Sequence, residues 1–259
     1  MLKFIHKSVQ SRLLWTVIPL FTLSLGLLTY LLVTDASREL KAQIENSAMN
    51  LVSSSSQSVN LFLDSVVNQV AQIGYVDAVK RMDWEQVEPY LKKITQAHPY
   101  FSSLAIADAT GSYYGTDGTS GEIGDRDYFR QAMSGKVYMS PTPIVARGTG
   151  ELVISAAVPI YDETETRTIG AFVALIRMSY VNDIIADIKL GTNSFSYLVD
   201  KNGLIISHPS PEIAMTRRID EIADSTDLDK LGAAMTQGKQ GFGAYKIDGK
   251  SYYTAYAPI

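Results

Sequence analysis

The segment SLAIADATGSYYGTDG, residues 103–118, carries the pattern that decides the fold. A short apolar run ends at Asp108, a turn closes at Gly111, and a second run passes through Tyr113 and Tyr114. Short apolar runs separated by Asp and Gly are typical of two antiparallel strands joined by a tight turn. The segment therefore predicts a β-hairpin.

The hairpin pattern returns later in the chain. FSYLVDKNGLIISHP, residues 195–209, has an aspartate and a glycine in the same places, and a second echo links SAAVPIYD at 155–162 with TAYAPI at 254–259. Repeated patterns in the same order indicate tandem modules of like architecture. We predict an α+β protein with two tandem modules, each a small antiparallel sheet with helices and loops on one face.

The two modules differ at their ends. The first echo is followed by the strand IGAFVALIRM, residues 169–178, whereas the second echo ends at Ile259. An unpaired interior strand edge is unfavourable in a native sheet. We therefore expect the second module, residues 181–259, to lack its last strand and to continue beyond the given sequence.

The N-terminal part predicts a membrane anchor. Residues 13–33, LLWTVIPLFTLSLGLLTYLLV, carry no charge and are long enough to cross a bilayer as one helix. A cleaved signal peptide is the alternative, but the apolar run is long and no small-x-small cleavage site follows it. Residues 1–12 hold three basic residues and no acid, which favours a cytoplasmic N-terminus in the inner membrane. Everything after residue 33 is then expected to be periplasmic or extracellular.

A long helix is predicted to follow the span. Residues 34–80 contain no proline, and apolar residues recur every three, four or seven positions from Val52 to Ile73. A second, short helix fits Trp84 to Ala97. We expect the first module to occupy residues 81–180.

Composition excludes several classes of function. The chain has no cysteine and three widely spaced histidines, so we expect no metal site, thiol chemistry or other cofactor. Without the three basic residues of the first 33, the exported part has 20 basic against 27 acidic residues, which argues against a nucleic-acid partner. No nucleophile elbow is present, so we do not expect an enzyme.

The stretch DRDYFRQA, residues 125–132, concentrates charged and aromatic residues. An arginine offers a planar fork of donors to an anion, and aromatic rings supply apolar walls. Arg126, Tyr128 and Phe129 are therefore candidate ligand-binding residues. In the alternative interpretation Asp125 caps a helix, Arg126 pairs with an acid elsewhere, and Phe129 fills the core.

Three weaker candidates for the same site are Tyr113, Ser140 and Arg147. Roles in a loop or in a strand ladder are the alternative for each of them.

The order of membrane span, long helix, DRDYF box, SGK turn, TGELV hairpin and YLVDKNGLIISHP resembles the double-Cache sensor domains of bacterial transmembrane receptors. The similarity runs from Asp35 to the end and is most specific over residues 125–160. It implies two PAS-like modules beside one long helix and a small-molecule pocket in the membrane-distal module. It also implies a homodimer that belongs to a chemotaxis receptor, a sensor kinase or a cyclic-di-GMP enzyme.

The resemblance also bears on the ligand. In amino-acid-binding members, a similar arginine, any residue, tryptophan, tyrosine box grips the ligand carboxylate, and Arg126, Tyr128 and Phe129 fall on those positions. Those members also place an aspartate where Leu175 stands and a tyrosine near Gly121. We therefore expect an organic acid or similar polar metabolite without an ammonium group. A structural or protein-docking ectodomain without a small-molecule ligand is the alternative.

The charge asymmetry predicts the topology. A periplasm-active reporter fused after Ile259 should be active, and a cytoplasm-active reporter at that site should be silent, because residues 13–33 cross the membrane once with their basic flank inside. Fusions after Arg12 are the control and should behave in the opposite way. Cytoplasmic activity at Ile259 would contradict the sensor interpretation.

Overall fold

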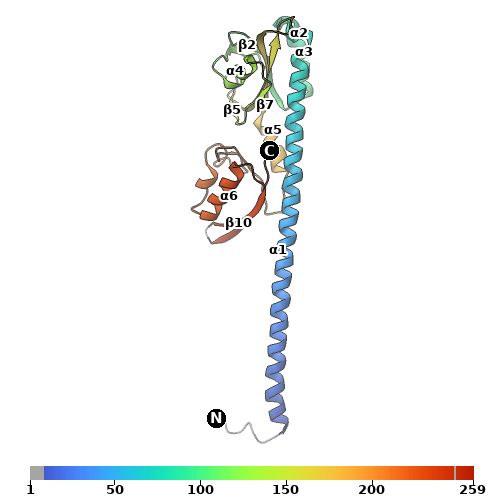
Figure 1. The fold of residues 1–259 in the computed structure, drawn as a ribbon, viewed down its shortest axis with the longest axis vertical. Helices are drawn as coiled ribbons and strands as arrows, with labels where there is room; N and C mark the ends of the chain where they lie inside the picture. The colour runs from blue at the N-terminus through green and yellow to red at the C-terminus, as the bar shows by residue number, and fades with distance from the viewer. Residues whose placement is uncertain (1–8, 248) are drawn as a thin grey trace. The chain divides into compact units, whose positions relative to one another are not determined.

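The computed structural model describes residues 9–247 and 249–259. It is a mixed α+β structure in which a long apolar helix precedes antiparallel sheet, so the predicted fold class is confirmed (Figure 1). The helices are α1 (Val9–Gly74), α2 (Asp77–Lys80), α3 (Trp84–Ala97), α4 (Asp127–Met133), α5 (Met178–Ala186) and α6 (Thr226–Thr236), with a 3-10 turn at Ile219–Glu221. The strands are β1 (Phe101–Asp108), β2 (Ser112–Gly115), β3 (Ser120–Glu122), β4 (Tyr138–Met139), β5 (Ile144–Val145), β6 (Leu152–Tyr161), β7 (Thr168–Arg177), β8 (Leu198–Val199), β9 (Ile205–Ser207), β10 (Gly241–Ile247) and β11 (Lys250–Tyr256).

The helix α1 has two parts with different surroundings. Its residues up to Ala48 belong to one compact unit, and the rest belongs to the unit 49–259. Within the first part, the apolar residues 15–33 are exposed, with Leu20 and Leu23 more than 70% accessible. By length and composition, α1 is therefore long and apolar enough to cross a membrane, as predicted for residues 13–33.

The second part of α1 lies against the sheet. Val59, Val66, Val70 and Ile73 are buried, which confirms the predicted apolar periodicity. The sequence predicted a helix that continues to residue 80, but α1 ends at Gly74. Val76 is extended, and the short helix α2 follows it. A Cβ on Gly74 would lie 2.6 Å from Val158 Cγ2, so only a glycine allows the helix end to approach β6 this closely.

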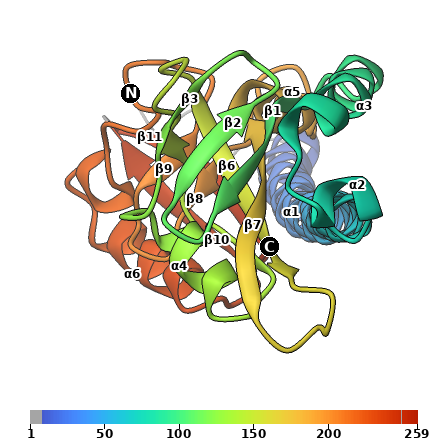
Figure 2. The ribbon, with the colours of Figure 1, turned by 90° about the horizontal axis from the view of Figure 1, so that it is seen from above.

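One antiparallel sheet organises the first module. Its strand order is β3-β2-β1-β7-β6-β4, with β5 also pairing with β6. Figure 2 shows α1 and α3 on one side of this sheet and α4 on the other. On the side of α1 the strands present large residues such as Leu104, Ile106 and Phe172, all buried. On the side of α4 they present small residues such as Ala105 and Ala107.

The second hairpin repeats the turn of the first. Asp108 Oδ1 accepts a hydrogen bond from Thr110 N at 2.8 Å, and Asp200 Oδ1 accepts one from Asn202 N at the same distance. The glycines that close the two turns have φ of +94° at Gly111 and +85° at Gly203, a region that favours glycine. The predicted echo is thus confirmed in the turn, although the flanking strands β8 and β9 form a sheet of only two strands. The strands β10 and β11 form a separate two-stranded sheet.

The burial of Phe172 predicts how much stability its substitution removes. Phe172→Ala should lower the free energy of unfolding by about 3–5 kcal/mol, because the ring is fully buried between β7 and α1. Phe195→Ala, at a ring that is 47% exposed, is the matched control and should cost about 1.5 kcal/mol or less. Urea unfolding of the full chain in detergent measures both, and equal losses would contradict this assignment of the core.

Candidate functional site

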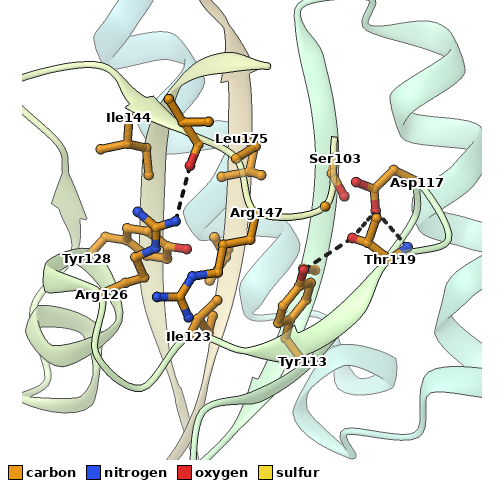
Figure 3. A pocket seen from close by; sticks show the side chains of 15 residues that line it. Ser103, Tyr113, Asp117, Thr119, Ile123, Arg126, Tyr128, Ile144, Arg147 and Leu175 are labelled. Carbon is orange, nitrogen blue, oxygen red and sulfur yellow. Dashed lines mark hydrogen bonds between the residues drawn. The ribbon is translucent and has the colours of Figure 1, made fainter. Parts of the chain in front are cut away.

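A cavity of about 30 Å³ lies on the small-residue side of the sheet (Figure 3). Ala105 and Val173 belong to its floor, since both lie on the face of the sheet that meets α4. The cavity is lined by Ser103, Ala105, Tyr113, Asp117, Thr119, Ile123, Arg126, Tyr128, Ile144, Val145, Ala146, Arg147, Gly148, Val173 and Leu175. The alanines on this face leave room that larger side chains would fill.

Arg126 lines the cavity and keeps hydrogen-bond donors that a ligand could use. It is the N-cap residue of α4, in extended conformation, and its Nη2 donates to the carbonyl oxygen of Val145 at 3.1 Å. Its Nε is buried and has no hydrogen-bond partner within residues 9–247 and 249–259. No carboxylate of the described side chains forms an ion pair with Arg126, so the alternative role as a partner of a distant acid is not seen.

Tyr128 is buried beside Arg126. Burial raises the pKa of its phenol to about 12, although the positive charges of Arg126 and Arg147 act in the opposite direction. The phenol therefore keeps its proton at physiological pH. It offers the cavity a neutral hydrogen-bond donor.

Arg147 is held by the residue that precedes Arg126. Its Nη2 donates to the carboxylate of Asp125, and its Nη1 donates to the carbonyl oxygen of Glu122. The bond from Arg147 is the largest cause that lowers the pKa of Asp125. Asp125 thus pairs with Arg147 and is not the helix cap, which corrects the alternative interpretation of the box. Both side chains are exposed, by 41% for Arg147 and 65% for Asp125, so the pair is weak and free to rearrange.

Two of the six candidate residues do not line the cavity. Phe129 is buried in the cluster between α4 and the sheet, where it fills space beside the alanines. Ser140 takes part in a strand ladder: its N donates to Ser155 O at 2.8 Å and its Oγ accepts from Ser155 N at 3.0 Å. The structure brings the other four together, namely Tyr113, Arg126, Tyr128 and Arg147.

The sequence did not reveal the rest of the cavity wall. Ser103 and Leu175 are register partners on β1 and β7, and this pairing joins strands that are far apart in the sequence. Asp117 and Thr119 come from the turn between β2 and β3, where a DGT sequence gives no signal beyond that of a turn. The described residues hold no group of three or more His, Asp or Glu side chains placed for a metal ion.

Comparison with known families gives the fold a name. The family model dCache_1, described as Cache domain, matches residues 36–259. The chain belongs to the Cache domain family. The predicted resemblance is confirmed, and the match begins within α1, three residues after the apolar stretch, and runs to residue 259.

Solved structures agree with this Cache fold. The ligand-binding domain of the Pseudomonas fluorescens chemoreceptor CtaA, in complex with L-serine, has a TM-score of 0.64 at 16% identity, covering 82% of this chain and 89% of that one. That of the Campylobacter jejuni chemoreceptor Tlp3, with 4-methylisoleucine, has a TM-score of 0.63 at 13% identity, covering 82% and 85%. The extracellular domain of mmHK1S-Z2, designated a histidine kinase, has a TM-score of 0.63 at 14% identity, covering 83% and 93%. No curated protein matches the chain in sequence.

Gly148 closes the cavity on the side of Arg147. A Cβ at this position would lie 2.2 Å from Thr119 Cγ2 and 2.6 Å from Thr119 Cβ. Gly148→Ala should therefore push the two loops apart and lower the free energy of unfolding by about 1–3 kcal/mol. Thermal unfolding of the full chain and hydrogen exchange of residues 144–150 measure the change.

The control is Gly191→Ala, where an added Cβ meets no atom within 4 Å. It should leave the unfolding temperature nearly unchanged. Equal behaviour of the two variants would show that Gly148 and Thr119 are not packed as described.

Proposed function

We propose that this chain is the extracytoplasmic sensing part of a bacterial transmembrane signalling receptor, and that Arg126 anchors an anionic group of a small metabolite. A carboxylate is the favoured group because it matches the planar fork of a guanidinium. The single observation that carries the proposal is the buried, unpartnered Nε of Arg126 at a cavity wall, next to a neutral Tyr128 phenol.

Family and neighbours support this proposal. The chain is a Cache domain protein with an apolar helix long enough to anchor it in a membrane. CtaA and Tlp3 are chemoreceptors crystallised with amino acids or an analogue, and mmHK1S-Z2 is designated a histidine kinase. We propose that the receptor is of one of three types, namely a chemotaxis receptor, a sensor kinase or a cyclic-di-GMP enzyme.

The sheet offers a route from ligand to helix. The strand β7 contributes Val173 and Leu175 to the cavity wall, while the residues that alternate with them belong to the core shared with α1, namely Phe172, Ala174 and Ile176. A ligand that binds one conformation of β7 more tightly increases the population of that conformation, and with it the matching packing of β7 against α1. A homodimer would carry the shift as a small displacement of one α1 relative to its partner, for which about 1–3 kcal/mol of coupling suffices.

The small size of the cavity favours a second candidate function, that of an ectodomain without a small-molecule ligand. A volume of about 30 Å³ holds water and not a metabolite, as expected for a structural or protein-docking ectodomain. On the sensor proposal, the exposed side chains of Asp125 and Arg147 move aside together, as a pair, to admit the ligand. Ligand-binding measurements decide between these two functions.

Arg126→Gln tests the anchor. Thermal shift of the full chain in detergent, screened against acetate, pyruvate, succinate, glutarate and other small carboxylates, should find a stabilising compound. At 100 times its dissociation constant, that compound contributes about 2.7 kcal/mol. Arg126→Gln should raise the dissociation constant by about 10-fold or more, because a charge-assisted hydrogen bond contributes about 1.5–3 kcal/mol. Arg126→Lys should recover little, because it lacks the fork.

The control is Arg130→Gln, on the same helix but outside the cavity. It should bind the stabilising carboxylate as the natural chain does. Retained affinity in Arg126→Gln would place the ligand elsewhere. Unfolding of Arg126→Gln and Arg126→Lys alike would make Arg126 a structural residue, and the absence of any stabilising compound would favour the docking ectodomain.

A further inference from the structure

Asp117 brings a carboxylate to the same cavity as Arg126. Its Oδ1 accepts hydrogen bonds from Thr119 N at 3.2 Å and from Thr119 Oγ1 at 2.8 Å. Within the described parts of the chain, no donor binds Oδ2, and no cation forms an ion pair with Asp117. The carboxylate therefore keeps an oxygen and its full negative charge available for a ligand.

The carboxylate of Asp117 is turned toward the sheet. A Cβ on Gly115 would lie 2.5 Å from Asp117 Oδ1 and 2.9 Å from Ser103 Oγ. The carboxylate of Asp117 and the hydroxyl of Ser103 therefore both lie next to Gly115. Ser103 is itself buried on β1 and lines the cavity. A carboxylate beside a hydroxyl is a suitable acceptor pair for an ammonium group.

The two charged ends are far apart across the sheet. Asp117 follows β2, whereas Arg126 binds the carbonyl oxygen of Val145 on β5, which pairs with β6. The strands β1 and β7 run between β2 and β6, and neighbouring strands are about 4.8 Å apart. Figure 3 shows Arg126 and Asp117 on opposite sides of the cavity.

The wall between these ends is apolar. Leu175 lies between them in Figure 3, and Val173 and Ala105 come from the same face of the sheet. The other cation of the cavity, Arg147, is already neutralised by Asp125. The cavity thus has one free cation, an apolar middle and one free anion among the described side chains.

We propose that the ligand is an elongated zwitterion, such as an ω-amino acid, whose carboxylate binds Arg126 and whose ammonium group binds Asp117 and Ser103. Its methylene groups pack on Leu175. An α-amino acid carries its ammonium and carboxylate groups on the same carbon and does not reach both ends. The inference rests on the proposed function, because it takes Arg126 as the carboxylate anchor.

Matched compounds test the zwitterion. The probes are the ω-amino acids from 3-aminopropanoate to 6-aminohexanoate, the unsubstituted carboxylates of the same lengths, and the α-amino isomers, each titrated into the full chain in detergent by calorimetry. At least one ω-amino acid should bind about 10-fold or more tightly than its carboxylate and its α-amino isomer. Equal or tighter binding of the α-amino isomer would overturn the proposal.

Asp117→Asn assigns the ammonium subsite. The substitution keeps the Oδ1 acceptor for Thr119 but removes the charge, so it should abolish the advantage of the ω-amino acid and leave carboxylate binding unchanged. Asp162→Asn is the matched control, because Asp162 also accepts from the threonine two residues on but lies outside the cavity. It should leave both affinities unchanged.

The outcomes separate the two proposals. If carboxylates bind through Arg126 and the amino group adds no affinity, the elongated zwitterion is wrong and the anchor stands. If the ω-amino acid keeps its advantage in Asp117→Asn, the assignment to Asp117 is wrong. If none of the three series binds, the proposed function fails together with this inference.

Discussion

Alternation of large and small side chains along the central strand β1 is the constraint on which the first module depends. Leu104 and Ile106 face α1, while the intervening Ala105 and Ala107 face α4. A strand buried on both faces usually carries bulky residues on both. Here, the small residues on one face make room for aromatic rings and a cavity, and the large residues on the other provide the core. The same strands therefore build the candidate site and hold the helix.

This arrangement ties the cavity to α1 at the end of β7. Arg177 closes that strand and donates from Nη1 to the carbonyl oxygen of Pro99 at 2.6 Å, just before β1 begins. Three residues later, the ring of Tyr180 lies 5.5 Å from that of Phe62 on α1. Tyr100 packs on the same Phe62 ring at 5.5 Å. The start of β1 and the end of β7 thus both lie near Phe62 on α1. A shift of either strand would therefore move its contact with the helix.

Local signals in the sequence predicted the turns, the apolar face of α1 and the cavity position of Arg126, because each depends on neighbouring residues. The rest of the cavity wall was not predicted, since Ser103 and Leu175 meet only through long-range strand pairing. The absence of an acid at Leu175 led us to expect a ligand without an ammonium group. That expectation considered one strand, whereas the structure places the carboxylate of Asp117 in the same cavity from another loop.

The box DRDYF also explains why only one of the two cavity arginines is available. Asp125 pairs with Arg147, and Asp127 accepts a hydrogen bond from the hydroxyl of Tyr138 on β4 at 2.7 Å, so both acids of the box bind residues from other segments. Arg126, between them in sequence, points to the cavity and pairs with neither. A motif rich in both charges therefore leaves a net positive group at the cavity wall. Residue types alone do not give this result, because it depends on which partner each acid meets in the fold.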